Sequence, residues 1–416
     1  MAADLFPANS PSVEPDELLE RFSQVRSFTC DLARPLSPED QCVQSMPDAS
    51  PTKWHLAHTS WFFEAFLLSS QGAAYAPLDS RFAYLFNSYY EALGRRHPRP
   101  ERGLLTRPSH EEVQRYRFHV DECMKEMLTS ASSHRWDQMA PLVELGLQHE
   151  QQHQELILTD ILHALSCNPL LPAYNAAAVL PDLRLAKNSR DANWLSCPGG
   201  LVEVGHSGTG FSFDNELPRH QVFLQPFAIA HRLVTCGDYA AFMADGGYER
   251  PDLWLSDGWS MVQNEGWRSP AYWIAPGEGL SPAQHWQVFG LGGVRPLNHD
   301  SVLTHVSFYE ACAYAEWAKA RLPTEFEWEL AFGNPGITQM MGHAWQWTRS
   351  SYEPYPGFRT LPGAVGEYNG KFMVGQQVLR GSSSATPPGH ARSTYRNFFP
   401  PSARWQFSGI RLARDA

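Results

Sequence analysis

Two histidines spaced for a metal ion stand in the segment His149-Glu-Gln-Gln-His153. Residues four apart lie on one face of an α-helix, so both imidazoles can reach a common point. This spacing is a frequent way to supply two metal ligands. Glu150 follows the first histidine, as the general base of a zinc hydrolase does, so the pair is compatible with hydrolysis as well as with redox chemistry.

A third imidazole is expected from the apolar segment Trp54-His55-Leu-Ala-His58. A histidine that faces the interior of a helix bundle needs a hydrogen-bond partner or a metal, because burial of an unpaired ring nitrogen is costly. Either histidine taken alone is compatible with an ordinary core residue. Together with the pair at 149 and 153, one of them completes a three-histidine site. Such a site leaves about half of an octahedral sphere open for substrates and O2.

Four amphipathic segments are expected to position these histidines. Apolar residues recur at helical spacing from Asp16, after Pro51, over residues 110–131 and over residues 142–166. Four long helices, with a loop-rich insertion between the second and the third, predict a four-helix bundle over residues 1–180.

Residues 181–416 differ in composition and in hydrophobic pattern, and we expect the domain boundary between residues 175 and 190. This part is rich in Gly, Pro and Trp, and its apolar runs are short. One clear helix is expected, over residues 307–322. The pattern predicts an α+β domain, so the chain as a whole is an α+β protein of two domains.

Composition excludes several classes of partner. The net charge is −11, from 33 basic and 44 acidic residues, which argues against binding of nucleic acid or of an anionic membrane surface. Seven scattered cysteines without a C-x-x-C motif indicate reduced thiols. The polar, acidic N-terminus does not look like a signal peptide, and no apolar run approaches the roughly 20 residues of a membrane span. We therefore expect a cytoplasmic enzyme that acts on small molecules.

Four separated segments resemble the ergothioneine-forming sulfoxide synthases. They are SPTKWHLAHTSWFFE, LFNSYYEALGRRHPRPERGLL, HEQQHQELILTDILH and YRNFFPPSARWQFSGIRLAR. The resemblance runs from about residue 15 to the C-terminus. It implies a DinB-like four-helix bundle joined to a formylglycine-generating-enzyme-like domain, which is a C-type-lectin-like α+β fold.

The resemblance also implies a reaction and its metal. Family members use iron(II) and O2 to attach sulfur to the imidazole ring of hercynine, the trimethylated betaine of histidine. The iron ligands fall on His58, His149 and His153. Gln152 and Asn397 match an amide pair that contacts hercynine in the family.

Aromatic residues complete the site that the resemblance implies. Phe398 and Phe399 would line the trimethylammonium group, since a quaternary ammonium cannot donate hydrogen bonds and favours aromatic faces. With Asn397 they are expected to close the pocket from the second domain. Tyr89 and Tyr90 match a tyrosine pair found in part of the family, and one of them is expected to donate a proton during bond formation.

The sulfur or selenium donor is expected to bind near Arg99 and Arg102, because guanidinium groups bind carboxylates bidentately. Cysteine or γ-glutamylcysteine is the expected donor. The family has a cysteine where this chain reads Gly-Ser-Ser-Ser-Ala-Thr-Pro over residues 381–387, and residues 333–348 also depart from the family pattern. The selenoneine synthases share the bundle and the iron site but take a selenosugar, so they remain an alternative.

Three other classes of function are compatible with parts of the chain. A formylglycine-generating oxidase needs a cysteine pair, and the second domain offers Cys197, Cys236 and Cys312, none of them in a matching motif. A zinc hydrolase would use His149, Glu150 and His153. A non-catalytic ligand-binding module would not require the three histidines. The sequence leaves the oligomeric state open.

Overall fold

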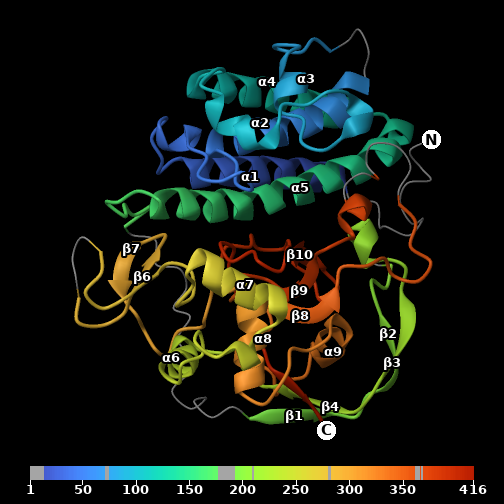
Figure 1. Cartoon of the computed structure of the whole chain (residues 1–416). Helices are drawn as coiled ribbons and strands as arrows, with labels where there is room; N and C mark the ends of the chain where they lie inside the picture. The colour runs from blue at the N-terminus through green and yellow to red at the C-terminus, as the bar shows by residue number, and fades with distance from the viewer. Residues whose placement is uncertain are drawn as a thin grey trace. The chain divides into compact units, whose positions relative to one another are not determined.

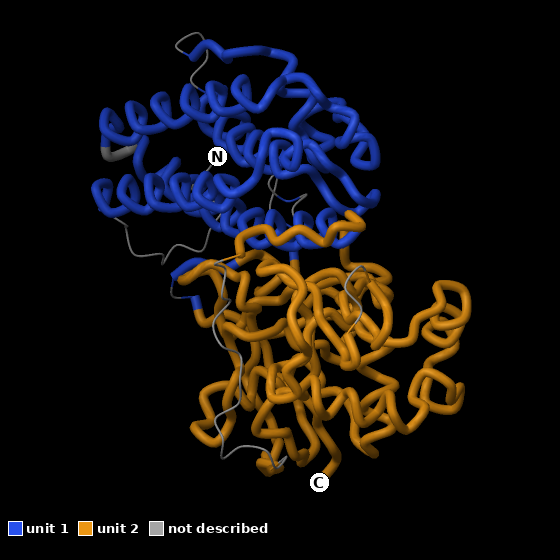
Figure 2. Tube along the Cα trace, turned by 90° about the vertical axis from the view of Figure 1, so that its left-hand side faces the viewer, with its two compact units in different colours: residues 1–167, 208–212, 359–370 blue, residues 168–207, 213–358, 371–416 orange. Residues whose placement is uncertain are grey.

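The computed structural model describes residues 14–70, 75–176, 193–208, 210–279, 283–360, 366 and 369–416. The chain divides into two compact units (Figure 2). Unit 1 contains residues 1–167, 208–212 and 359–370, and unit 2 contains residues 168–207, 213–358 and 371–416. Most of the boundary expected at residues 175–190 lies outside the described residues.

Unit 1 is helical, as predicted. Its helices are α1 Pro15–Ala33, α2 Thr52–Phe63, α3 Phe82–Leu85, α4 His110–Ser130 and α5 Ser133–Ser166 (Figure 1). The four long helices are α1, α2, α4 and α5, and α2 contacts the other three. A π-helical turn over Glu64–Leu68 extends α2. Every residue of α2 is buried, so this helix has no solvent-facing stripe and forms the centre of the unit.

The fourth long helix begins earlier than predicted. α5 begins at Ser133, not at Leu142, and contains Pro141 in its interior. Proline removes a backbone hydrogen bond and usually interrupts a helix. Here Trp136 and Met139, which precede it, are buried, and this packing favours the longer helix.

Unit 2 contains four small sheets. The strands are β1 Trp194–Cys197, β2 Gly200–Val204, β3 His220–Leu224, β4 Phe227–Ala230, β5 Trp273–Ile274, β6 Gln287–Gly290, β7 Gly293–Pro296, β8 Trp345–Ser351, β9 Gln377–Gly381, β10 Asn397–Phe399, β11 Ser408–Gly409 and β12 Ala413–Asp415. The sheet orders are β1-β4-β12, β10-β9-β8-β11, β2-β3 and β5-β6-β7. Only the β8–β11 pair is parallel among these named strands. The sheet that contains β10 therefore positions residues 397–399.

The helix predicted over residues 307–322 is confirmed by α8 Phe308–Trp317, but the expectation of a single helix in the second part of the chain was wrong. Within the described residues unit 2 has α6 Cys236–Ala244, α7 Ser256–Glu265, α8 Phe308–Trp317 and α9 Glu325–Ala331. The three helices that were not predicted, α6, α7 and α9, have ten residues or fewer, which is too short for a clear helical periodicity. Capping boxes start three of the four helices, at Thr235, Ser307 and Thr324. No helix among the described residues combines the length and apolarity that crossing a membrane requires.

Candidate metal centre

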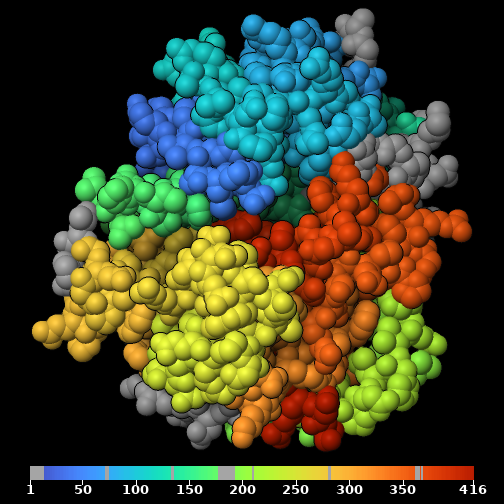
Figure 3. Space-filling model, in the orientation of Figure 1, coloured from blue at the N-terminus to red at the C-terminus, as the bar shows by residue number. Residues whose placement is uncertain are grey.

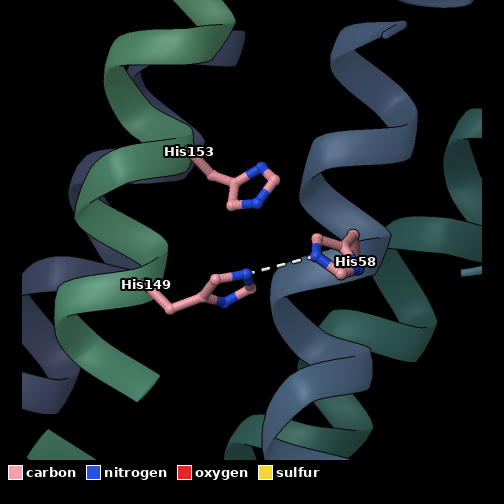
Figure 4. Close-up of side chains that lie close together, drawn as sticks. All are labelled: His58, His149 and His153. Carbon is pink, nitrogen blue, oxygen red and sulfur yellow. Dashed lines mark hydrogen bonds between the residues drawn. The ribbon is translucent and has the colours of Figure 1, made fainter. Parts of the chain in front are cut away.

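Helices α2 and α5 bring the three predicted ligands together. His58 on α2 and the pair His149 and His153 on α5 each offer a ring nitrogen, and these atoms lie within 4.8 Å of one another (Figure 4). The Nε2 atoms of His58 and His149 are 3.2 Å apart. All three side chains are buried. Within the described part of the chain, no other group of three or more His, Cys, Asp or Glu side chains converges in this way.

The three imidazoles are neutral at pH 7. Burial lowers the pKa of His58 and of His153 well below the ordinary value, and neighbouring imidazoles lower both further. Burial also lowers the pKa of His149 to about 3. Neutral imidazoles keep a lone pair, and three of them form a donor set that suits iron, zinc, copper or nickel. The residues present therefore fit a divalent transition metal.

The hydrogen bonds of His58 orient its lone pair toward the cluster. Its Nδ1 lies 2.6 Å from the carbonyl oxygen of Phe86, which can only accept, so Nδ1 carries the proton. Nε2 then holds the lone pair, and it faces His149. Of the two candidates on α2, His58 joins the cluster. His55 does not, and its Nδ1 lies 2.8 Å from Nδ1 of His153.

Aromatic rings of α2 cover the imidazoles. Trp54 stacks on His58, with centroids 4.5 Å apart and planes 16° apart. Phe62 stacks on His149, with centroids 4.6 Å apart and planes 30° apart. Neither ring is among the site residues predicted from the sequence. Trp54 and His58 are four residues apart on one helix, and this spacing is the sequence feature that indicates contact between their rings.

Gly146 on α5 permits the close approach of the two helices. A Cβ atom at this position would lie 2.5 Å from Cε1 of Phe63 and 3.2 Å from Cε1 of Phe62. Phe63 and Phe62 are buried and cannot move away freely. The absence of a side chain here therefore helps to place Phe62 against His149.

Gly146→Ala is expected to lower the thermal midpoint of unit 1. Alanine improves helix propensity by about 1 kcal/mol, but overpacking a buried site costs about 1–3 kcal/mol, and the 2.5 Å contact puts this site near the upper end. Circular dichroism on heating measures the change. Gly290→Ala is the control, because no atom lies within 4 Å of the added Cβ. Equal midpoints for both variants would contradict the expected clash.

The carboxylate of Glu150 does not serve the cluster as a base. It accepts hydrogen bonds from Arg26, from Arg117 and from the hydroxyl of Thr29, which use both of its oxygens. It is fully buried, and the two arginines hold its pKa at about 2 against the effect of burial. A carboxylate so held is a poor acceptor for the proton of a metal-bound water. These contacts argue against the zinc hydrolase alternative.

The tyrosine pair lies in the aromatic shell of unit 1. Tyr90 is buried, and its ring centroid is 5.5 Å from Trp61 and 5.2 Å from Phe66. Trp61 in turn stacks on His58 at 5.4 Å. Tyr89 is half-buried and packs on Tyr90. Tyr90 therefore contacts Trp61, which in turn contacts the cluster residue His58. A role in proton transfer remains a prediction for both tyrosines.

The two candidate arginines differ in their surroundings. Arg99 is exposed and donates to the backbone carbonyl of Asp48. Arg102 is buried, donates to the hydroxyl of Ser50 at 2.9 Å, and lies 3.4 Å from the ring centroid of Trp54. No ion pair joins it to a carboxylate of the described residues. Burial lowers the pKa of Arg102 to about 8. A buried cation of this kind favours an anionic ligand.

The other predicted substrate residues lie on separate elements. Gln152 is half-buried on α5, next to His153. Asn397, Phe398 and Phe399 form β10 in unit 2 and are half-buried. Phe398 stacks on Tyr352 at 4.0 Å, and the side chain of Asn397 accepts from the backbone N–H of Phe398. Their contacts with hercynine remain predictions.

The cysteines of unit 2 do not form the pair that a formylglycine-generating oxidase needs. Cys197, Cys236 and Cys312 are all free. Burial raises the pKa of Cys236 and of Cys312 to about 12, so both are protonated and weak as nucleophiles or ligands. The oxidase alternative therefore lacks its reactive groups among the described residues.

Comparison with known proteins accounts for both parts of the chain. Residues 21–157 match the family model of the DinB superfamily, and residues 182–335 and 333–416 match that of the sulfatase-modifying factor enzyme 1-like domain. These matches confirm the predicted pairing of a DinB-like bundle with a formylglycine-generating-enzyme-like domain. The formylglycine-generating enzyme of Streptomyces coelicolor is 37% identical over 32% of this chain and 45% of its own length.

Relatives that align with both parts of the chain identify the family more specifically than matches to single domains. The hercynine oxygenase of Mycobacterium tuberculosis is 30% identical and aligns with 96% of this chain and 99% of its own length. The hercynine oxygenase of Mycolicibacterium smegmatis is 32% identical over 65% of this chain and 71% of its own length. Because the similarity extends through both units, this chain belongs to the hercynine oxygenase family, the ergothioneine-forming sulfoxide synthases.

Proposed function

We propose that this chain is an iron(II)- and O2-dependent oxidoreductase that forms a C–S or C–Se bond on the imidazole ring of hercynine, in ergothioneine or selenoneine biosynthesis. The observation that supports it is the convergence of three buried, neutral imidazoles in a member of the hercynine oxygenase family. The negative net charge and the scattered cysteines favour a cytoplasmic setting. The favoured donor is cysteine or γ-glutamylcysteine.

The proposed reaction with a thiol donor balances with one O2. The ring C–H bond and the donor S–H bond break, and a C–S bond forms. One oxygen atom of O2 becomes the sulfoxide oxygen and the other leaves as water. O2 thereby accepts four electrons, two from formation of the C–S bond and two from oxidation of the sulfur. Iron(II), held by His58, His149 and His153, would supply the activation of O2 and lower the pKa of the donor thiol.

The roles proposed for the side chains follow from their chemistry. Arg102 would hold a donor carboxylate, because its guanidinium is buried and forms no salt bridge within the described residues; Asp160 acts on it only through its charge. Arg99 is the second, more exposed candidate for the donor. Tyr89 or Tyr90 would donate a proton during bond formation.

Hercynine has its own set of proposed partners. The amides of Gln152 and Asn397 would bind its imidazole, and Phe398 and Phe399 would contact its trimethylammonium group. These assignments rest on the family resemblance and on the preference of a quaternary ammonium for aromatic faces.

Product analysis tests the proposal. The iron(II)-loaded protein is incubated in air with hercynine and, in separate reactions, cysteine, γ-glutamylcysteine or a selenosugar, and the products are identified by mass spectrometry. We expect a hercynine sulfoxide conjugate with one of the thiols. A conjugate with the selenosugar alone would identify a selenoneine synthase instead.

Two controls make the result specific. L-Histidine replaces hercynine in one, since it carries the same imidazole without the trimethylammonium group. Zinc(II) replaces iron(II) in the other, since zinc has no redox chemistry. Under anaerobic conditions hercynine is also expected to perturb the spectrum of the iron-loaded protein. Absence of both the conjugates and the perturbation would refute the proposal.

A further inference from the structure

A chain of buried hydrogen bonds extends from His153 away from the three-histidine cluster. Nδ1 of His153 lies 2.8 Å from Nδ1 of His55, and Nε2 of His55 lies 3.0 Å from Oδ2 of Asp160. The same carboxylate oxygen accepts the backbone N–H of Ser50 at 2.8 Å. The side chains of His153, His55 and Asp160 are each at most 9% exposed. Water is therefore not needed to explain how these polar atoms are satisfied.

The spacing along the helices explains the alignment. Asp160 lies seven residues after His153 on α5, which is two turns further along the same face. His55 lies three residues before His58 on α2, so one face of α2 carries both the cluster histidine and the intermediate imidazole. The two helices are in contact, and His55 lies between His153 and Asp160.

The hydrogen-bond chain has one consistent arrangement of protons when both histidines are neutral. The carboxylate of Asp160 can only accept, so Nε2 of His55 carries the proton and its Nδ1 holds a lone pair. Nδ1 of His153 then donates to that lone pair. The remaining nitrogen of His153, Nε2, is left with its lone pair. The carbonyl of Phe86 has the same effect on His58.

We propose that His55 and Asp160 are positioning residues that fix the tautomer and ring orientation of His153, so that its Nε2 lone pair is presented to the metal. Outer partners of metal-bound histidines commonly have this effect, and their loss typically costs about 10- to 100-fold in metal affinity. The proposal rests on the metal site of the proposed function. It concerns metal binding alone, so it can be tested without substrates.

Metal titration of variants tests the proposed role of His55 and Asp160. The full chain is titrated with cobalt(II), whose visible absorption reports ligand geometry, and with iron(II) under anaerobic conditions. We expect His55→Ala and Asp160→Ala to weaken binding by about 10- to 100-fold and to change the cobalt spectrum. His55→Gln and Asp160→Asn retain groups that can accept and donate at the same places, and we expect them to restore most of the affinity and the spectrum.

The controls separate positioning from folding and from the proposed function. Circular dichroism confirms that each variant is folded, and His163→Ala tests a histidine of the same helix outside the hydrogen-bond chain. Wild-type affinity and spectrum in folded His55→Ala would overturn the inference and leave the proposed function intact. Failure of the wild-type chain to bind either metal would overturn both. Equal losses in His55→Ala and His55→Gln would also overturn it, because a side chain that can accept and donate hydrogen bonds would then fail to restore the metal site.

Discussion

His149→Ala is expected to reduce bound iron from one ion per chain to background and to abolish hercynine-dependent activity. The variant removes one of three imidazoles, and the two that remain come from different helices. Loss of an outer partner of a metal ligand already costs about 10- to 100-fold, so loss of a ligand is expected to cost more than about 100-fold in affinity. Metal analysis of the reconstituted protein gives the first measurement, and product formation gives the second.

The matched control for His149→Ala is His163→Ala. His163 lies on the same helix, outside the cluster, where its Nδ1 contacts the hydroxyl of Ser45 at 2.7 Å. We expect this variant to keep its iron and its activity. Circular dichroism of both apo proteins tests whether the bundle is intact. Stoichiometric iron and full activity in a folded His149→Ala protein would remove that residue from the site.

The sequence could predict the histidine pair of α5 because the information is local. Two residues four apart on a helix share a face whatever the helix packs against. The choice between His55 and His58 is different. α2 is buried on all sides, so no hydrophobic stripe indicates which of its residues face α5. The family resemblance identified His58, while periodicity left both open.

The sequence pattern does not indicate the connection between Asp160 and the three-histidine cluster, for a related reason. Its spacing from His153 places both residues on one face of α5, but their link passes through His55 on another helix. A contact between elements depends on how they pack, which a single sequence pattern does not encode. The same argument applies to Arg102, which looks equivalent to Arg99 in sequence and is buried in the fold.

Errors in the helix boundaries have a physical origin too. Pro141 is normally a sign that a helix begins or ends, and burial of Trp136 outweighs it here. In unit 2 the short helices depend on side-chain caps such as Thr324 with Glu327. A capping box involves only two positions, so it is easily lost among the many Ser, Thr, Asp and Glu residues of a loop-rich domain.

Glu150→Gln is expected to destabilise unit 1 by about 3–5 kcal/mol at pH 7, since it removes the buried negative charge that pairs with both Arg26 and Arg117. Arg26 keeps a second partner in Asp121, whereas the one ion pair of Arg117 among the described residues is to Glu150. Glu144→Gln is the matched control on the same helix. Its partner Arg21 is about one-third exposed, so this change is expected to cost less than about 1 kcal/mol.

The cost of Glu150→Gln should also depend on pH in a defined direction. The folded chain holds the pKa of Glu150 at about 2, below its ordinary value of 4.5. As pH falls below 4.5 the unfolded chain takes up this proton first, which favours unfolding. A stabilisation of about 3 kcal/mol is therefore complete above pH 4.5 and lost as pH falls from 4.5 to about 2. Glutamine has no proton to take up, so the difference in urea midpoint between wild type and variant should shrink across that window. A difference in urea midpoint that stays constant between pH 7 and about pH 3 would mean that the charge of Glu150 does not stabilise the bundle. Glu150 would then contribute to the packing of Arg26 and Arg117 only through its shape.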